Sequence, residues 1–243
     1  MAWSTPITKS TGDLVSAADW NTNTSDNMLA STPITKGSII VGNATAPAEL
    51  TVGSNGQRLE ADSAEATGLK WVGGPLLVES QTLSGAVATI TFTSIPGIYN
   101  SLELHVYTRS DASAASDEVI LNFNNDTGNN YDCVRISGRE ADSLTVFEQV
   151  GTAYMTIGTI CGNTSPADAF DLVILKVPNY AGAVGEKVLS SESSNKTAES
   201  TTNLYTRHGH GWWRSTAAIT EIDLALSSAG DFMIGSSFSL YGL

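Results

Sequence analysis

Residues 102–107 read Leu102-Glu103-Leu104-His105-Val106-Tyr107, with an apolar side chain at the first, third and fifth positions. Successive side chains of a β-strand point to opposite faces, so this pattern predicts a strand with one face on a core and the other toward solvent. The same period of two recurs along the chain, where the predicted strand residues are Ile90 and Phe92; Val119, Leu121 and Phe123; Phe170, Leu172 and Ile174; Ile222, Leu224 and Leu226; and Phe232, Ile234, Phe238 and Leu240. About nine or ten such runs fit in residues 75–243, which predicts an antiparallel, jelly-roll-like β-sandwich.

The composition also favours an all-β fold. Of the 243 residues only 15% are charged, and 22 are glycine. A helical bundle requires more Glu, Lys, Leu and Arg, whereas short apolar runs between Ser, Thr and Gly are typical of strands and turns. Cys133 and Cys161 both fall in predicted strands, which indicates buried free thiols rather than a disulfide framework.

The charge balance excludes two classes of partner. The chain has 12 Lys and Arg against 25 Asp and Glu, a formal net charge of −13. A protein that grips nucleic acid or an anionic membrane surface needs a basic face, which this sequence does not offer. No apolar run approaches the length of a membrane span, and the N-terminus lacks a secretory signal. We therefore expect a soluble protein, made and kept in the cytosol of the cell that produces it.

The chain divides at Gly73-Gly74-Pro75 into two parts of different texture. Residues 4–9, Ser-Thr-Pro-Ile-Thr-Lys, return unchanged at 31–36, and between the copies Ser16 and Asp19 form a capping-box pattern that predicts a short helix. Residues 37–74 contain strand-sized apolar runs separated by Gly and Asn-Gly turns. Such a segment has too little apolar surface to order itself alone, so its composition predicts oligomerisation.

Several motifs resemble those of tailed-bacteriophage virion appendages, the head-fibre, decoration and tail-fibre proteins. Residues 14–21 look like the N-terminal signature of these proteins, and residues 37–59 resemble their shaft motif, which closes in a Gly-Leu-Lys-Trp box, here Gly68 to Trp71. Further pieces resemble the terminal domain that follows such shafts: residues 90–96, Tyr99, Leu102, 109–110, 123–124, 130–131, 178–180, Lys187 and 239–243. The resemblance implies a homotrimer with an anchoring segment (1–36), a trimeric shaft (37–74) and a β-sandwich head (75–243), located in the virion and made in the bacterial host cytoplasm.

An anchoring segment of this kind needs side chains that grip another virion protein. Trp3, Trp20 and Met28 are the candidates, because aromatic residues and Met are enriched in the buried centres of protein interfaces. The expected partner is a capsid or tail protein.

The sequence contains no motif of a catalytic or cofactor site. The nucleophile elbow, the zinc-protease motif and the phosphate-binding loop are all missing, so we predict no enzyme, no cofactor and no metal. Residues 122–128 faintly resemble a calcium loop, but the positions that require Gly and Glu hold Thr127 and Cys133, which favours a hairpin turn. Paired carboxylates of a glycan depolymerase would leave no signature among 25 acidic residues.

Residues 205–213 are the strongest candidate recognition surface. The candidates are Tyr205, His208, His210, Trp212 and Trp213. On a strand His208 and His210 would share a face, so three chains could offer six imidazoles to a metal; the alternative is a polar loop. The adjacent tryptophans would lie on opposite faces, which leaves one of them for a subunit interface, a covering loop or a sugar ring.

The sequence therefore predicts a structural virion protein, a trimeric head fibre, decoration or short fibre with a head domain available for contact with the host surface. The alternatives are a tail-fibre receptor-binding protein that recognises host glycans, and a glycan depolymerase.

Overall fold

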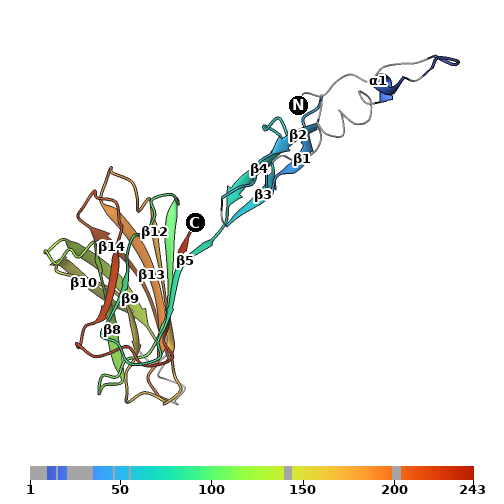
Figure 1. The fold of residues 1–243 in the computed structure, drawn as a ribbon. Helices are drawn as coiled ribbons and strands as arrows, with labels where there is room; N and C mark the ends of the chain where they lie inside the picture. Colours follow the sequence, from blue (N-terminus) through green and yellow to red (C-terminus); the bar gives the residue numbers. More distant parts are fainter. Residues whose placement is uncertain are drawn as a thin grey trace. The chain divides into compact units, whose positions relative to one another are not determined.

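A computed structural model of the chain describes residues 10–14, 16–20, 35–45, 47–54, 56–139, 144–198 and 204–243. The fold is all-β, with strands β1 to β16 paired antiparallel in one eight-stranded, one four-stranded and two two-stranded sheets. The described residues hold one helix, α1 (Ala17–Trp20), and within them no helix is long and apolar enough to cross a bilayer. The chain forms two compact units, Met1–Gly74 and Pro75–Leu243 (Figure 1).

Unit 1 consists of the short helix and two hairpins. The Ser16 Oγ accepts a bond from the Asp19 N–H at 3.1 Å, and the Asp19 carboxylate accepts one from the Ser16 N–H at 2.9 Å, which confirms the predicted capping box. Strand β1 (Ile39–Gly42) pairs with β2 (Pro47–Leu50), and β3 (Gln57–Ala61) pairs with β4 (Leu69–Gly73). None of the residues described in unit 1 is buried.

Unit 2 is a sandwich of the two larger sheets. The eight-stranded sheet has the order β10 (Thr145–Thr152), β9 (Tyr131–Gly138), β14 (Leu204–Trp213), β13 (Lys187–Lys196), β12 (Asp171–Pro178), β7 (Ser101–Thr108), β16 (Ser237–Gly242), β5 (Leu76–Thr82). The four-stranded sheet has the order β11 (Met155–Cys161), β8 (Ser116–Phe123), β15 (Ile222–Leu226), β6 (Thr89–Phe92). We call the side of the eight-stranded sheet that faces the smaller sheet its inner face, and the opposite side its outer face.

The predicted alternation holds in most strands. In β7, β8 and β15 the buried residues are the predicted ones, such as Leu104, Leu121 and Leu224. Strand β12 is the exception, because its buried set is Val173, Leu175 and Val177, whereas Phe170, Leu172 and Ile174 lie on the other side. Ile234 is also exposed. The run 170–177 is apolar on both faces, so period two alone could not choose between them.

The turn at residues 124–130 joins two sheets. Strand β8 lies in the small sheet and β9 in the large one, so the predicted hairpin is wrong, although Asn124 and Asn125 do take positive φ values of 52° and 54°. The Asp126 carboxylate organises the turn by accepting a bond from the Gly128 N–H at 2.9 Å. The chain therefore crosses from one layer to the other at this point.

Residues 237–242 form a central strand. Strand β16 pairs with β5 on one side and β7 on the other, and Leu240 is fully buried while Tyr241 points outward, as the alternation predicts. Cys133 and Cys161 are buried, free thiols. Burial raises the pKa of the Cys161 thiol to about 11, so the group stays protonated at neutral pH.

Candidate functional site

Strand β14 distributes the candidate recognition residues over two faces. His208, His210 and Trp212 lie on the outer face, in register with exposed or half-buried residues of β9 and β13. Trp213 is on the inner face and only 3% exposed. It therefore takes no part in an outer surface.

Trp213 is a core residue tied to the turn before β9. Its indole stacks on Tyr131 at 6.5 Å between ring centroids, and its Nε1–H donates to Asp126 Oδ2 at 2.7 Å. That bond satisfies the one polar atom of a buried indole. The adjacent tryptophans thus lie on opposite faces, as their spacing predicts.

Tyr205 also lies on the inner face, near the start of β14. The guanidinium carbons of Arg207 and Arg139 lie 5.0 and 5.2 Å from its ring centroid. Tyr205 is therefore part of a cationic cluster, separate from the two histidines.

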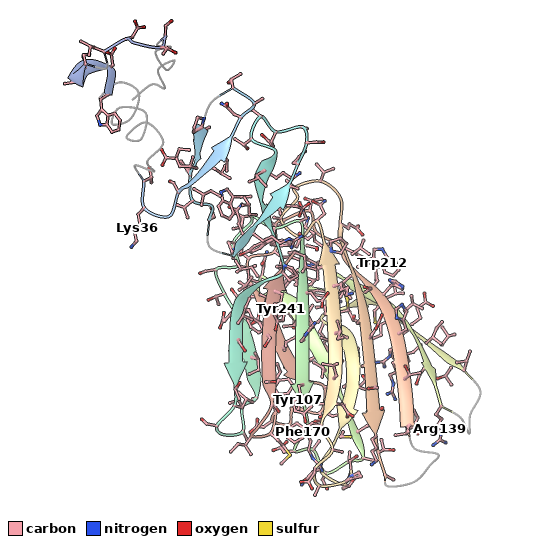
Figure 2. All side chains as sticks on the ribbon, turned by 90° about the vertical axis from the view of Figure 1, so that its right-hand side faces the viewer. Lys36, Tyr107, Arg139, Phe170, Trp212 and Tyr241 are labelled. Atoms are coloured by element: carbon pink, nitrogen blue, oxygen red, sulfur yellow. The ribbon has the colours of Figure 1, made fainter. Side chains whose placement is uncertain are left out.

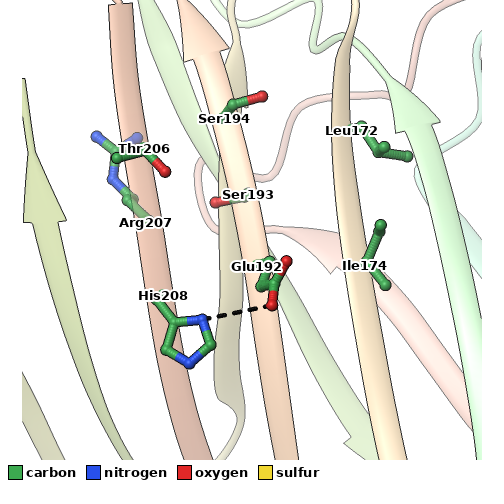
Figure 3. A pocket seen from close by; sticks show the side chains of 8 residues that line it. All are labelled: Leu172, Ile174, Glu192, Ser193, Ser194, Thr206, Arg207 and His208. Atoms are coloured by element: carbon green, nitrogen blue, oxygen red, sulfur yellow. Dashed lines mark ion pairs between the residues drawn. The ribbon is translucent and has the colours of Figure 1, made fainter.

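His208 and His210 form an exposed pair on the outer face. Their ring centroids are 5.2 Å apart with nearly perpendicular planes, and His208 Nδ1 lies 3.7 Å from Glu192 Oε1 of the neighbouring strand (Figure 3). The two residues lie in a strand, so the alternative of a polar loop is wrong. His208 borders a shallow pocket of about 240 Å³ lined by Leu172, Ile174, Glu192, Ser193, Ser194, Thr206, Arg207 and His208.

The third histidine of the chain lies on the same face, on β7. His105 Nε2 is 2.6 Å from Glu103 Oε1, and its ring lies 5.2 Å from that of Tyr241. The hydrogen bond with His105, helped by Lys176 at 3.5 Å, holds the pKa of Glu103 below its usual range. All three histidines therefore stand beside a carboxylate or another histidine on one face.

The cross-strand register places one continuous row on this face. Its members, from β10 to β5, are Val146, Ile136, His208, Glu192, Ile174, His105, Ser239 and Ser80. Val146 and Ile136 are 70% and 47% exposed, and Tyr107 stacks on Phe170 at 5.2 Å at one end of the sheet, with Trp212 toward the other (Figure 2). Along this row aliphatic side chains stand beside two imidazoles and one carboxylate, so the outer face offers both apolar and hydrogen-bonding groups.

Glu192, Ile174 and His105 belong to this surface but were not predicted as site residues. The alternation of residues 187–196 could have placed Glu192 on the solvent-facing side of a strand. Pairing of β13 with β14 was needed to bring it to His208, and that pairing is tertiary information.

The described part of the chain assembles no metal centre, and it includes only one of the three predicted anchoring residues, Trp20. Within it, no group of three His, Cys, Asp or Glu side chains could hold a metal ion. Trp20, at the end of α1, is 63% exposed. Trp3 and Met28 lie outside the described residues.

Comparison with known proteins gives no relative for this arrangement. No protein-family model, curated protein or solved structure matches the chain.

Proposed function

We propose that the chain is a structural protein that assembles with further copies of itself through residues 1–74 and carries the sandwich of residues 75–243 as a projecting head. The observation that carries this proposal is the contrast in burial. Unit 1 has no buried residue among those described, whereas unit 2 has a continuous apolar core. Two-stranded hairpins without a core are marginal in water, so unit 1 gains its order when other chains cover it.

The sequence resemblance to phage appendages indicates the kind of particle to which such an assembly would belong. We infer a trimeric virion appendage of a tailed bacteriophage, a head fibre, decoration or short fibre. Its anchor is residues 1–36, its shaft residues 37–74 and its head residues 75–243, and a capsid or tail protein receives the anchor. The shaft-like motif ends in Trp71, whose Nε1–H donates to the Thr51 carbonyl at 2.7 Å. This bond joins the last strand of one hairpin to the chain that leaves the other.

We further propose that the head is a jelly roll. Two four-strand groups, β5-β16-β7-β12 and β6-β15-β8-β11, support this, because along the chain these eight strands alternate between the groups except at β8 and β11, which follow one another in the same group. Strands β9, β10, β13 and β14 are then additions that widen one sheet to eight strands.

The test is the oligomeric state of two chains, the full-length protein and residues 75–243, by light scattering coupled to size-exclusion chromatography. We expect a trimer for the full chain and a folded monomer for residues 75–243, because only the latter has its own core. A full-length monomer contradicts the proposal. So does a trimer of residues 75–243, since assembly would then lie in the head.

A receptor-binding role is the second candidate, favoured by Trp212. Its indole is half-buried on the outer face, next to His210 on the same strand, in the position of a platform for a sugar ring. We expect Trp212→Ala to abolish adsorption of particles to the host while melting changes little. The core mutant Trp213→Phe serves as the structural control. Unchanged adsorption by the Trp212 variant contradicts this role.

A further inference from the structure

The inner face of the eight-stranded sheet changes character from one side to the other. Across β12, β7 and β16 it is apolar, with Leu175, Leu104 and Leu240 buried in the core. On β9 and β14 the inner face is apolar at one end, where Tyr131, Cys133 and Trp213 belong to the core. Farther along these two strands it holds Arg135, Arg207 and other polar or small residues. This stretch of arginine and serine does not serve apolar packing, so it requires another explanation.

Two adjacent cross-strand rows contribute residues to the floor of a cleft on this side. The first row is Phe147, Arg135, Gly209 and Ser191, and the second is Thr145, Ser137, Arg207 and Ser193. Glycine at 209 lets its neighbours in the first row approach closely, since a Cβ there would lie only 3.2 Å from the Arg135 Cβ and from the Ser191 Oγ. The members of these rows that line the cleft are Phe147, Arg135, Thr145, Ser137 and Arg207.

The small sheet supplies the opposite wall. The cleft measures about 480 Å³ and is lined by Ser116, Asp117, Glu118, Arg135, Ser137, Thr145, Phe147, Thr159, Arg207, Ser227 and Ser228. Thr145, Phe147 and Ser116 at its rim are exposed, so solvent can enter. The two acidic residues are already engaged: Asp117 accepts bonds from Ser110 and Ser228, and Glu118 pairs with Arg135 Nη2.

Donor atoms remain unused in and beside this cleft. Arg135 Nη1 is buried and has no hydrogen-bond partner in the described part of the chain. The same is true of Asn195 Nδ2, whose Oδ1 accepts a bond from Arg207. Buried donors are normally satisfied, because a donor without a partner has lost its bond to water.

Two arginines and two carboxylates, Asp117 and Glu118, line the cleft, and both carboxylates are already engaged by neighbouring residues. Burial, followed by repulsion from Arg135, lowers the pKa of the Arg207 guanidinium. Arginine nonetheless remains charged at neutral pH, so two cations line the cleft. Arg135 pairs with Glu118 and lies 4.2 Å from the centroid of the Phe147 ring. Arg207 donates to Asn195 Oδ1 and lies over the Tyr205 ring. Among the described residues that line the cleft, the buried side-chain atom without a partner is a cationic donor, Arg135 Nη1.

We propose that this cleft binds an oxyanion, a carboxylate or a phosphate, carried on a hydroxylated carbon skeleton, as in sugar acids and sugar phosphates. The oxyanion lies between Arg135 Nη1 and Arg207, which offer the planar donors suited to such groups. The volume is larger than a bare ion needs, and the hydroxyls of Ser137, Thr145 and Thr159 are matched to the hydroxyls of a sugar. This inference does not depend on the oligomeric state or on the outer face.

The test is calorimetric titration of the full chain with glucuronate and with glucose 6-phosphate, which distinguish the two sources of the oxyanion. Glucose and inorganic phosphate are the comparison ligands. We expect one of the two acids to bind, and both comparison ligands to bind at least about tenfold more weakly. Arg207→Gln is expected to weaken binding by about 10- to 100-fold, the range of a charge-assisted hydrogen bond.

Two further variants test whether a loss of binding is specific to the cleft. Arg58→Gln, in unit 1, removes an exposed arginine and should leave binding unchanged. The double variant Glu118→Gln with Arg135→Gln removes the inter-sheet ion pair without stranding a buried charge, and it should also weaken binding while the melting temperature reports that the fold is intact. The proposal is overturned if neither acid binds up to about 10 mM, if glucose or inorganic phosphate binds as tightly, or if folded Arg207→Gln binds as the parent does.

Discussion

The two hairpins of unit 1 and the sandwich of unit 2 use the same antiparallel pairing but differ in what covers it. In unit 1 the nearest approach to a core is Trp71, which lies against Gly53 and remains partly exposed. In unit 2 a set of side chains that includes Phe92, Phe232 and Phe238 has no exposed surface at all. Pairing of strands therefore gives local order, and burial gives a domain that stands alone.

The largest effect is expected from removal of Leu240–Leu243. Loss of the buried Leu240 costs about 2–5 kcal/mol, and the ladder bonds of β16 to β5 and β7 are lost with it. A domain is stable by about 5–15 kcal/mol, so we expect aggregation or a large fall in melting temperature. Calorimetry of the truncated and full chains measures the change in melting temperature.

Leu243→Ala is the matched control for this truncation. Leu243 is partly exposed, and its backbone N–H bonds to the Ser101 carbonyl at 2.9 Å whatever its side chain. We expect it to melt near the parent. A truncated protein that also melts within a few degrees of the parent would show that burial in β16 does not hold unit 2 together.

An intermediate effect is expected from Gly158→Val in β11. A Cβ at this buried glycine would lie 2.7 Å from Val173 Cγ2, across the two sheets. Overpacking of this kind costs about 1–3 kcal/mol, which corresponds to roughly 2–12 °C in melting temperature for a unit of this size. Gly85→Val, where nothing lies within 4 Å of the added Cβ, should change melting little. Equal melting of the two variants would contradict close packing between the sheets.

The smallest effect on unit 2 is expected from Trp71→Ala. This substitution removes the indole that joins the hairpins of unit 1, so the fraction of trimer at low protein concentration should fall, while the melting transition of the sandwich stays within about 1 °C of the parent. Analytical ultracentrifugation and calorimetry on the same sample measure both quantities. A sandwich destabilised by several degrees would mean that the two units do not differ as described.

The sequence predicts the sandwich because its core strands alternate strictly. Leu102, Leu104 and Val106 are separated by polar or amphipathic residues, so only one face can be buried. The same reasoning does not predict which face of β12 is buried, because Leu172 and Val173 are equally apolar. Only the position of β12 in the sheet decides that Val173 is the buried one. The connection after Phe123 has the composition of a hairpin turn, and its crossing between sheets depends on partners far away in the chain.

The candidate site is predicted less well, since it depends on several strands. The spacing of His208 and His210 places both on one face, and the Trp212-Trp213 pair places one indole inside. Glu192 reaches His208 only through strand pairing. Arg135 and Arg207 occupy inward positions that a period-two pattern assigns to apolar residues, so no sequence rule could have brought them to one cleft.

The position of β16 has a consequence for how fast the molecule folds. Its partners β5 and β7 lie at the opposite end of unit 2 in the sequence, for example in the pairing of Ser237 with Thr82. Contacts between such distant residues require closure of a long loop before any bond forms, and topologies dominated by them fold in about milliseconds to seconds. Until β16 enters, β5 and β7 each present an unpaired edge to other chains, so the rate of its insertion sets how long the folding chain is exposed to misassembly.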